Sequence, residues 1–256
     1  MNDTHPYKVF LLGGYDLEML TIKQLLEGRE ACVYIDKHLK WDNAFLSAYK
    51  DELSHYTDAP IYGIELQEDI PAPKHYHAID HHYQKEDMPC ALEQVAAILG
   101  VTLNRYQLLV ASNDKGYIPA MLSIAATQEE IEAIRRNDRL AQGVSPEDEK
   151  KAEASIAHHL SRHGSLTLVH SLTPCFSCIV DRLFPYHSLL VYNDQAWTFY
   201  GEGKNELVAQ MREDIHKKKL YFGGGANGFI GSVEGAYTKD EIHSFVEQIS
   251  IKYEQV

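Results

Sequence analysis

The feature that most constrains the fold is an alternation of short apolar runs with longer segments of helical periodicity. Short apolar runs that end at glycine or polar residues predict buried strands, and the periodic segments between them predict helices. We expect strands over residues 7–12, 31–35, 60–66, 75–79 and 107–111, and helices after Asp16, over 41–53 and over 89–99. Strands that alternate with helices are typical of a parallel, doubly wound α/β sheet.

The second half of the chain predicts a smaller α/β domain. A charged helical region covers 127–163, with helix starts at Thr127 and Ser145, and would place His158, His159 and His163 on a helix face. Beyond it we expect strands over 165–170, 188–192 and 197–200, and helices over 205–219 and 239–253. We place the domains at 1–145 and 146–256, joined by a helical linker.

Charge and composition limit the partners. The formal net charge is −13, from 37 acidic and 24 basic residues, whereas a grip on long duplex DNA needs a basic surface. A short or small anionic substrate is therefore expected. Since neither a membrane-spanning run nor a secretory signal is found, we expect a soluble, cytoplasmic protein with no membrane partner. Cys175 and Cys178 form a lone CxxC, which is interpreted as two helix-core cysteines.

Polar side chains follow the predicted strands at the point where each strand ends. Asp16 and Glu18 follow the first, Glu65 the third, Asp80-His81-His82 the fourth and Asp114 the fifth. Ligands bind at the carboxyl ends of strands in such sheets. Several carboxylates cannot share a cleft as bare charges, so a divalent metal pair is predicted, with manganese, zinc or iron suiting mixed aspartate and histidine ligands better than calcium.

Each of these residues also has a structural interpretation. Asp16 is a plausible N-cap, and Glu18 a first-turn partner of the helix dipole. The glycine-rich segment that contains Gly223, Gly224, Gly225 and Asn227 is either a tight turn between a strand and a helix or a cradle of backbone N–H groups for an anion.

The motifs resemble the DHH family of phosphoesterases. Residues 78–82 (Ala-Ile-Asp-His-His) are similar to the family signature, the helix after Cys90 to the helix that follows it, and 111–116 to the next acidic motif. Residues 223–231 resemble the glycine-rich loop of the associated DHHA1 domain. The resemblance implies manganese-dependent phosphodiester hydrolysis by a water activated between two metals, as in oligoribonucleases, single-strand exonucleases and cyclic-dinucleotide phosphodiesterases.

The resemblance also assigns residues. It implies catalytic roles for His81 and Asp80 and a cofactor of one or two Mn²⁺ ions. The implied metal ligands are Asp16, Glu18, Glu65, His82 and Asp114. The implied substrate contacts are Gly223, Gly224, Gly225 and Asn227.

Three motifs depart from the family pattern. A glycine of the stretch Gly13-Gly14 stands where the family has histidine, and Glu18 where it has aspartate. The bridging acid of the second motif is either Glu65 or Asp36. In the terminal loop, Gly225 or Ala226 takes the place of a histidine that touches substrate.

Three functions follow from this pattern. The first is a phosphodiesterase that acts on short oligonucleotides or a nucleotide-like phosphoester. The alternative is a degenerate, weakly active or inactive family member that binds a nucleotide or a protein partner, which the replaced ligands favour. An inorganic pyrophosphatase is the third, and the glycine-rich loop speaks against it. A homodimer stays open.

Overall fold

The computed structural model describes residues 7–82, 85, 87–223 and 228–254. The chain divides into two compact units, Met1–Gly143 and Val144–Val256. Of the described helices, none is long and apolar enough to cross a membrane.

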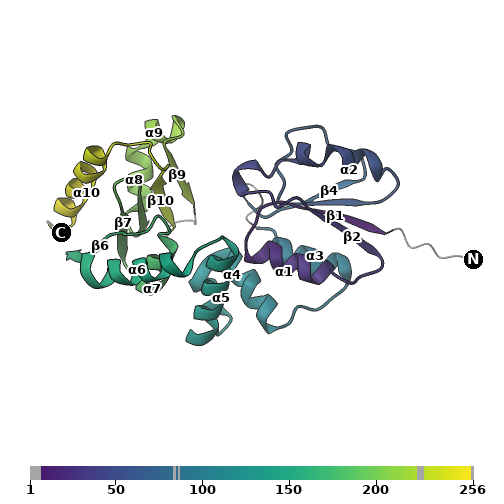
Figure 1. Cartoon of the computed structure of the whole chain (residues 1–256), viewed down its shortest axis with the longest axis horizontal. Coiled ribbons are helices and arrows are strands. Elements are labelled where there is room, and N and C mark those ends of the chain that lie inside the picture. Colours follow the sequence, from purple (N-terminus) through teal and green to yellow (C-terminus); the bar gives the residue numbers. More distant parts are fainter. Residues whose placement is uncertain (1–6, 83–84, 86, 224–227, 255–256) are drawn as a thin grey trace, which may run out of the picture. The chain divides into compact units, whose positions relative to one another are not determined.

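The described part of the first unit contains a four-stranded sheet in the order β2-β1-β3-β4. Its strands are β1 (Lys8–Leu12), β2 (Cys32–Asp36), β3 (Ile61–Ile64) and β4 (Tyr76–Ile79), all parallel. Helix α1 (Leu17–Leu26) and α3 (Ala91–Leu99) cover one face, and α2 (Lys50–His55) covers the other (Figure 1). The predicted parallel, doubly wound α/β class is confirmed.

Side-chain caps explain where the helices of this unit begin. The Oδ1 atom of Asp16 accepts a hydrogen bond of 2.8 Å from the backbone N–H of Met19 and starts α1. Thr127 caps α5 (Gln128–Ala141) in the same way. These bonds satisfy N–H groups that have no partner inside the helix.

The predicted strand over 107–111 is wrong, because these residues belong to helix α4 (Arg105–Ser123). Asn104 and Gln107 form a reciprocal capping box at its start, and Leu109 and Val110 are buried on its inner face. A short run with four apolar residues fits a buried strand and a buried helix equally well, so periodicity could not separate the two.

The predicted helix over 41–53 is also wrong in its first part. Two 3₁₀ turns, η1 (Trp41–Asn43) and η2 (Leu46–Tyr49), precede the short α2. Between these turns the backbone pairs with Gln67, whose N–H donates to the carbonyl of Ala44 and whose carbonyl accepts from the N–H of Leu46, both at 2.8 Å. This pairing takes the hydrogen bonds that a continuous helix would need.

The second unit is built on a mixed sheet, described as six strands in the order β5-β6-β7-β8-β10-β9. Only β6 and β7 pair in parallel among the strands described there. The strands are β5 (Leu160–His163), β6 (Leu166–His170), β7 (Ser188–Tyr192), β8 (Trp197–Gly201), β9 (Leu220–Gly223) and β10 (Phe229–Ser232).

The helices of this unit lie against two buried clusters. One cluster contains Val169 and Ile179 and receives α6 (Pro146–His159) and α7 (Ser177–Leu183). The other contains Trp197 and Ile242 and receives α8 (Lys204–Gln210) and α10 (Lys239–Glu254). Cys178 is buried in α7 and Cys175 lies just before it, half-buried, and both are free thiols.

Three predictions for the second unit need correction. His163 lies in β5, because the chain reverses at Gly164 (φ +56°) and pairs β5 with β6. The helix over 205–219 is split into α8 and α9 (Arg212–His216) at Met211, which packs with Ile215 against the core. Residues 220–223 and 229–232 pair as antiparallel strands, so the glycine-rich segment joins two strands and not a strand and a helix.

Candidate metal centre

The candidate site lies at the carboxyl edge of the parallel sheet of the first unit. Glu18 is in the first turn of α1, just after β1, while Glu65 directly follows β3. His81 and His82 follow β4. Parallel strands present their carboxyl ends at one edge, so the sheet brings side chains from distant parts of the sequence together.

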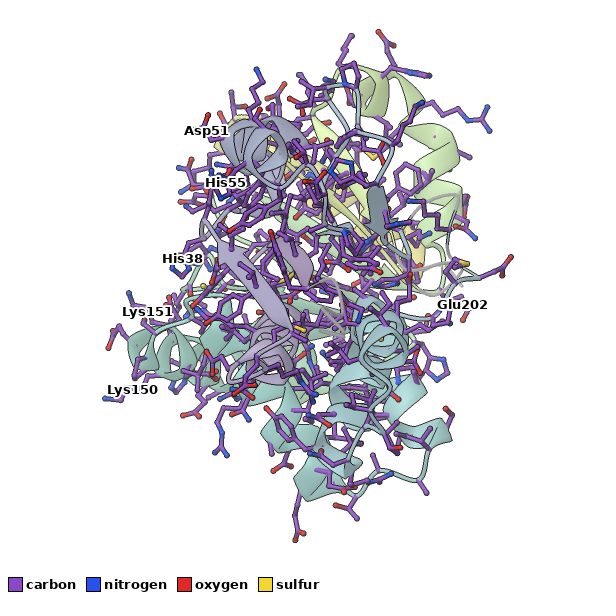
Figure 2. The ribbon with its side chains drawn as sticks, turned by 90° about the vertical axis from the view of Figure 1, so that its right-hand side faces the viewer. His38, Asp51, His55, Lys150, Lys151 and Glu202 are labelled. Atoms are coloured by element: carbon purple, nitrogen blue, oxygen red, sulfur yellow. The ribbon has the colours of Figure 1, made fainter. Side chains whose placement is uncertain are left out.

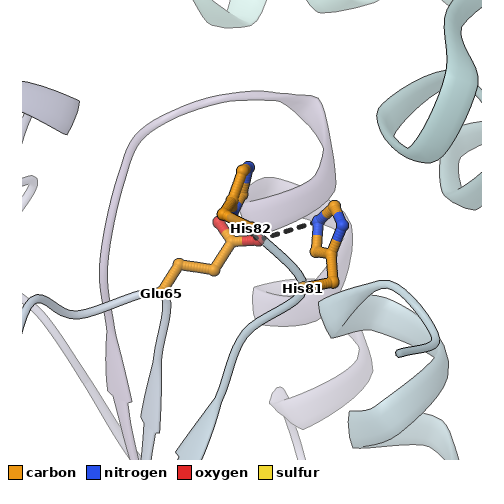
Figure 3. Close-up of side chains that lie close together, drawn as sticks. All are labelled: Glu65, His81 and His82. Carbon is orange, nitrogen blue, oxygen red and sulfur yellow. Dashed lines mark ion pairs between the residues drawn. The ribbon is translucent and has the colours of Figure 1, made fainter. Parts of the chain in front are cut away.

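His81 is the centre of the cluster. Its Nε2 atom lies 2.7 Å from Oδ2 of Asp114, 3.3 Å from Oε1 of Glu65 and 3.9 Å from Oε2 of Glu18. The four ligand atoms all lie within 4.8 Å of one another. Figure 3 shows the carboxylate of Glu65 directed toward His81, with the ring of His82 beside it. A second group, Glu65, His81 and His82, shares two of these residues.

The cluster is buried and poor in hydrogen bonds. Among the described residues, none supplies a well-aligned hydrogen bond to Oε2 of Glu18, to either carboxylate oxygen of Glu65, to Nε2 of His81 or to Oδ2 of Asp114. Buried polar atoms are normally hydrogen-bonded, and exceptions call for an explanation such as an ion. The ligand atoms present, carboxylate oxygens and an imidazole nitrogen, therefore fit a divalent cation such as manganese, zinc or iron.

The electrostatics of the cluster point the same way. Burial raises the pKa of Glu18 well above its usual range, and the charges of Asp114 and Glu65 raise it further. Burial also raises the pKa of Glu65, although His81 beside it acts in the opposite direction. Burial by itself would lower the pKa of His81, but contacts with Asp114 and Glu65 outweigh it and raise this pKa to about 10. The carboxylates are thus costly to ionise without a neighbouring positive charge.

The backbone at Glu65 holds the side chain in an uncommon conformation. Its φ is +51°, in the left-handed region that residues with a side chain rarely adopt, while its N–H donates to the carbonyl of Ile79 at 2.8 Å. The neighbouring chain passes so close at Gly13 that a Cβ there would overlap the carbonyl oxygens of Ile64 and Glu65. Such outliers cluster at functional sites.

Asp114 reaches the cluster from α4 and not from a strand end. Just after it the helix is interrupted at Gly116 and Tyr117, where Tyr117 has φ +58° and ψ −150°. Pro119 contributes to the break, because it has no N–H to bond the carbonyl of Lys115. The guanidinium of Arg135 lies 4.6 Å from the centroid of the Tyr117 ring.

A buried network holds this part of α4 against α5. Nη1 of Arg135 donates to Oδ1 of Asn113 at 2.9 Å and to Oδ2 of Asp138 at 2.7 Å. The sequence pattern did not identify these residues as part of the site. The signal available for them was a pair of arginine and aspartate spaced three apart in α5, whose side chains the structure buries.

Asp80 and His82 form a pair next to the cluster. Oδ1 of Asp80 accepts from the backbone N–H of His82 and lies 3.0 Å from its Nδ1. Nδ1 of His82 is also 3.8 Å from Oε1 of Glu65. The side chain of His82 is 40% exposed, against 7% for His81. The structure therefore places His81 among the carboxylates, and His82 at the rim with Asp80.

The structure separates the remaining candidates. Asp16 is buried and caps α1. Its pKa is raised, chiefly by burial and also by the charge of Glu65. It belongs to neither group of ligand atoms found among the described residues. Of the two candidates for the bridging acid of the second motif, Asp36 pairs with Lys23, with 3.0 Å between Oδ2 and Nζ. Glu65, the other candidate, belongs to both groups of ligand atoms. Gly223 ends β9, and Gly224, Gly225 and Asn227 lie outside the described residues.

The fold and the cluster define an α/β protein with a buried carboxylate and histidine centre at its sheet edge. No family model matches the chain, and no curated protein matches it. Among solved structures it is similar to the pGpG-specific phosphodiesterase PggH from Vibrio cholerae (12% identity, 97% of this chain and 98% of that chain, TM-score 0.48).

Two further solved structures are similar to this chain. One is the DHH domain of a protein described as a member of a family of ribosomal proteins (13% identity, 91% of this chain and 73% of that chain, TM-score 0.41). The other is RecJ in complex with Mn²⁺ from Thermus thermophilus (10% identity, 96% of this chain and 52% of that chain, TM-score 0.48). At these identities and scores, the similarity says nothing of the activity or substrate of this chain.

Proposed function

We propose that this chain is a metal-dependent phosphodiesterase that acts on short oligonucleotides or a nucleotide-like phosphoester. The observation that supports this function is the convergence of Glu18, Glu65, His81 and Asp114, whose buried ligand atoms lack well-aligned hydrogen-bond partners among the described residues. One divalent ion held by these four side chains would satisfy them, and Mn²⁺ is the first candidate by ligand type.

A divalent ion at this position supplies positive charge that polarises a phosphoester and lowers the pKa of water. The chain's own residues have separate roles around it. His81 and the three carboxylates would hold the ion, and their burial would limit the access of bulk water to it. Asp80 fixes the ring of His82 through Nδ1, so the half-exposed imidazole is oriented at the rim, where it would accept or donate a proton to the reacting oxygens.

This assignment refines the one expected from the resemblance. There His82 is a metal ligand and His81 and Asp80 are catalytic. In the proposal His81 is the metal ligand, because it is the histidine surrounded by carboxylates. His82, oriented by Asp80, is the general acid or base. Substrate contacts by the glycine-rich segment, Gly223 included, stay a prediction.

The test compares metal-stripped and Mn²⁺-restored protein on the dinucleotide pApA, with product followed by chromatography and bound metal by mass spectrometry. We expect hydrolysis only with metal, and one tightly bound ion per chain. Replacing a residue that hydrogen-bonds to a metal ligand lowers metal affinity or activity by about 10- to 100-fold. Replacing a ligand itself should cost more, so His81→Ala and Asp114→Asn should each lower the hydrolysis rate by at least about 100-fold.

Matched controls are available on α2. His55 and Asp51 are exposed there (Figure 2), so His55→Ala and Asp51→Asn should leave metal content and rate unchanged. Equal hydrolysis by metal-free and metal-loaded protein would overturn the proposal.

The second candidate is a family member that binds a nucleotide without turnover. It is favoured by the departures from the family motifs, a glycine in place of the first-motif histidine and Gly225 or Ala226 in place of the histidine of the terminal loop. Thermal stabilisation by a nucleotide, with metal bound and no product formed, would establish it. Turnover of pApA would exclude it.

A further inference from the structure

Trp41 is an exposed aromatic residue at the rim of the metal centre. It opens η1, in the segment that follows β2, and is 40% exposed. The centroid of its ring lies 5.6 Å from that of His82, and the ring of His82 lies 4.4 Å from that of His81. A single imidazole thus separates the indole from the ligand cluster.

Gly14 fixes the position of this indole. A Cβ atom at residue 14 would lie 2.5 Å from both Cδ2 and Cε2 of Trp41. These are the two carbons shared by the fused rings, so the backbone of Gly14 lies against a face of the indole and not against its edge. Only glycine leaves room for this packing, and the indole is held in place while much of it stays exposed.

Two neighbouring rings extend the same rim. Tyr15, which follows Gly14, is 36% exposed and packs edge-on against His38, with centroids 5.7 Å apart. Tyr15 and His38 come from the segments after β1 and β2, at the edge of the sheet that carries the metal cluster.

We propose that Trp41 is a specificity-determining residue that stacks on the base of a nucleotide whose phosphate lies at the metal centre. This inference rests on the proposed function and narrows it to substrates that carry a planar base. Base–aromatic stacking tolerates any base, because every base has a π face, so Trp41 selects for a base and not for a sequence.

The test measures the binding of AMP and of ribose 5-phosphate to Mn²⁺-loaded protein by calorimetry. The two ligands share the sugar and the phosphate and differ by the base. We expect AMP to bind about 5- to 150-fold more tightly than ribose 5-phosphate, the range that one stacked base provides. Trp41→Ala should abolish this preference by weakening AMP alone, and Trp41→Phe should keep most of it.

Two further variants sharpen the result. Tyr7→Ala removes an aromatic residue that is 45% exposed at the opposite, amino end of β1, and should leave the preference unchanged. Gly14→Ala pushes the indole from its position without deleting it, and should reduce the preference. The fluorescence of the exposed Trp41 gives an independent signal, since Trp197 is buried in the second unit.

Equal binding of the two ligands by the wild type, or an unchanged preference in Trp41→Ala, would overturn the inference. These outcomes are distinct from a failure of the proposed function. Hydrolysis of pApA with no preference for AMP would overturn the role of Trp41 alone, whereas a preference for AMP without hydrolysis would overturn the phosphodiesterase alone.

Discussion

Replacing Glu18 by glutamine should stabilise the metal-free protein and weaken its response to metal. The side chain of Glu18 is only 1% exposed; Oε1 accepts a hydrogen bond of 2.8 Å from the N–H of Leu92, and Oε2 has no well-aligned partner among the described residues. Glutamine keeps the shape and the acceptor facing Leu92. It removes a buried charge that faces Glu65 and Asp114.

The expected gain in the free energy of unfolding follows from the unsatisfied Oε2 atom of Glu18. Glutamine places an N–H₂ group at the position of Oε2, where it can donate to the neighbouring carboxylates of Glu65 and Asp114. An unsatisfied buried polar group costs about 1–3 kcal/mol, so the free energy of unfolding of metal-free Glu18→Gln should rise by about that amount. For a chain of this size each kcal/mol shifts Tm by roughly 2–4 °C. Mn²⁺ at 100 times its Kd should add about 2.7 kcal/mol to the wild type, and much less to the variant, which lacks one ligand.

The pH dependence supplies a second check. Burial raises the pKa of Glu18 in the folded state above its unfolded value. Such a carboxyl destabilises the fold where it is forced to ionise, and this destabilisation disappears as the pH falls toward the unfolded pKa of about 4.3. The advantage of Glu18→Gln should therefore be large near pH 7 and shrink toward pH 4.

The assay is thermal unfolding followed by circular dichroism, in chelator and in Mn²⁺, at several pH values. Glu68→Gln, which changes an exposed glutamate three residues after Glu65, is the matched control and should behave as the wild type. A Glu18→Gln protein that is no more stable without metal, or that keeps the full Mn²⁺-induced shift, would refute the reasoning.

Three other substitutions test the supports of the fold. Arg135→Met leaves the buried carboxylate of Asp138 without its arginine and should cost about 3–5 kcal/mol in chemical denaturation, with a loss of metal affinity as α4 shifts; a cost below about 1 kcal/mol would contradict this. Asn104→Ala removes the N-cap of α4 and should lower the free energy of unfolding by about 1 kcal/mol, whereas exposed Gln128→Ala should change it little. Asp148 has its pKa lowered by hydrogen bonds from Ser145 and Thr173, so it stabilises the fold above its unfolded pKa and this stability is lost as the pH falls below about 4. Asp148→Asn should therefore flatten the acid limb of a stability–pH curve, and an unchanged limb would count against the role.

The sequence by itself determined the strands and helices whose signals are local. The apolar runs before Gly13 and Asp80 predict β1 and β4, and the caps at Asp16, Thr127 and Ser145 predict helix starts that the structure confirms. A hydrophobic run ended by a polar residue, or a capping side chain three residues before the backbone N–H that donates to it, depends on neighbours in sequence only.

Tertiary structure decided what depends on residues far apart in the chain. The run over 107–111 is helical because its apolar face packs in the first unit, and the helix predicted over 41–53 is broken because Ala44 and Leu46 pair with Gln67. No short stretch of sequence contains both partners of such a pairing.

The site divides in the same way. The sequence identified Glu18, Glu65, His81, His82 and Asp114 as candidates, because polar residues stand out at the ends of apolar runs. Which histidine meets the carboxylates depends on where each ring points after β4, and which aromatic ring covers Gly14 depends on how the segment after β2 folds back. Those are properties of packing, which brings the loops after separate strands to one edge.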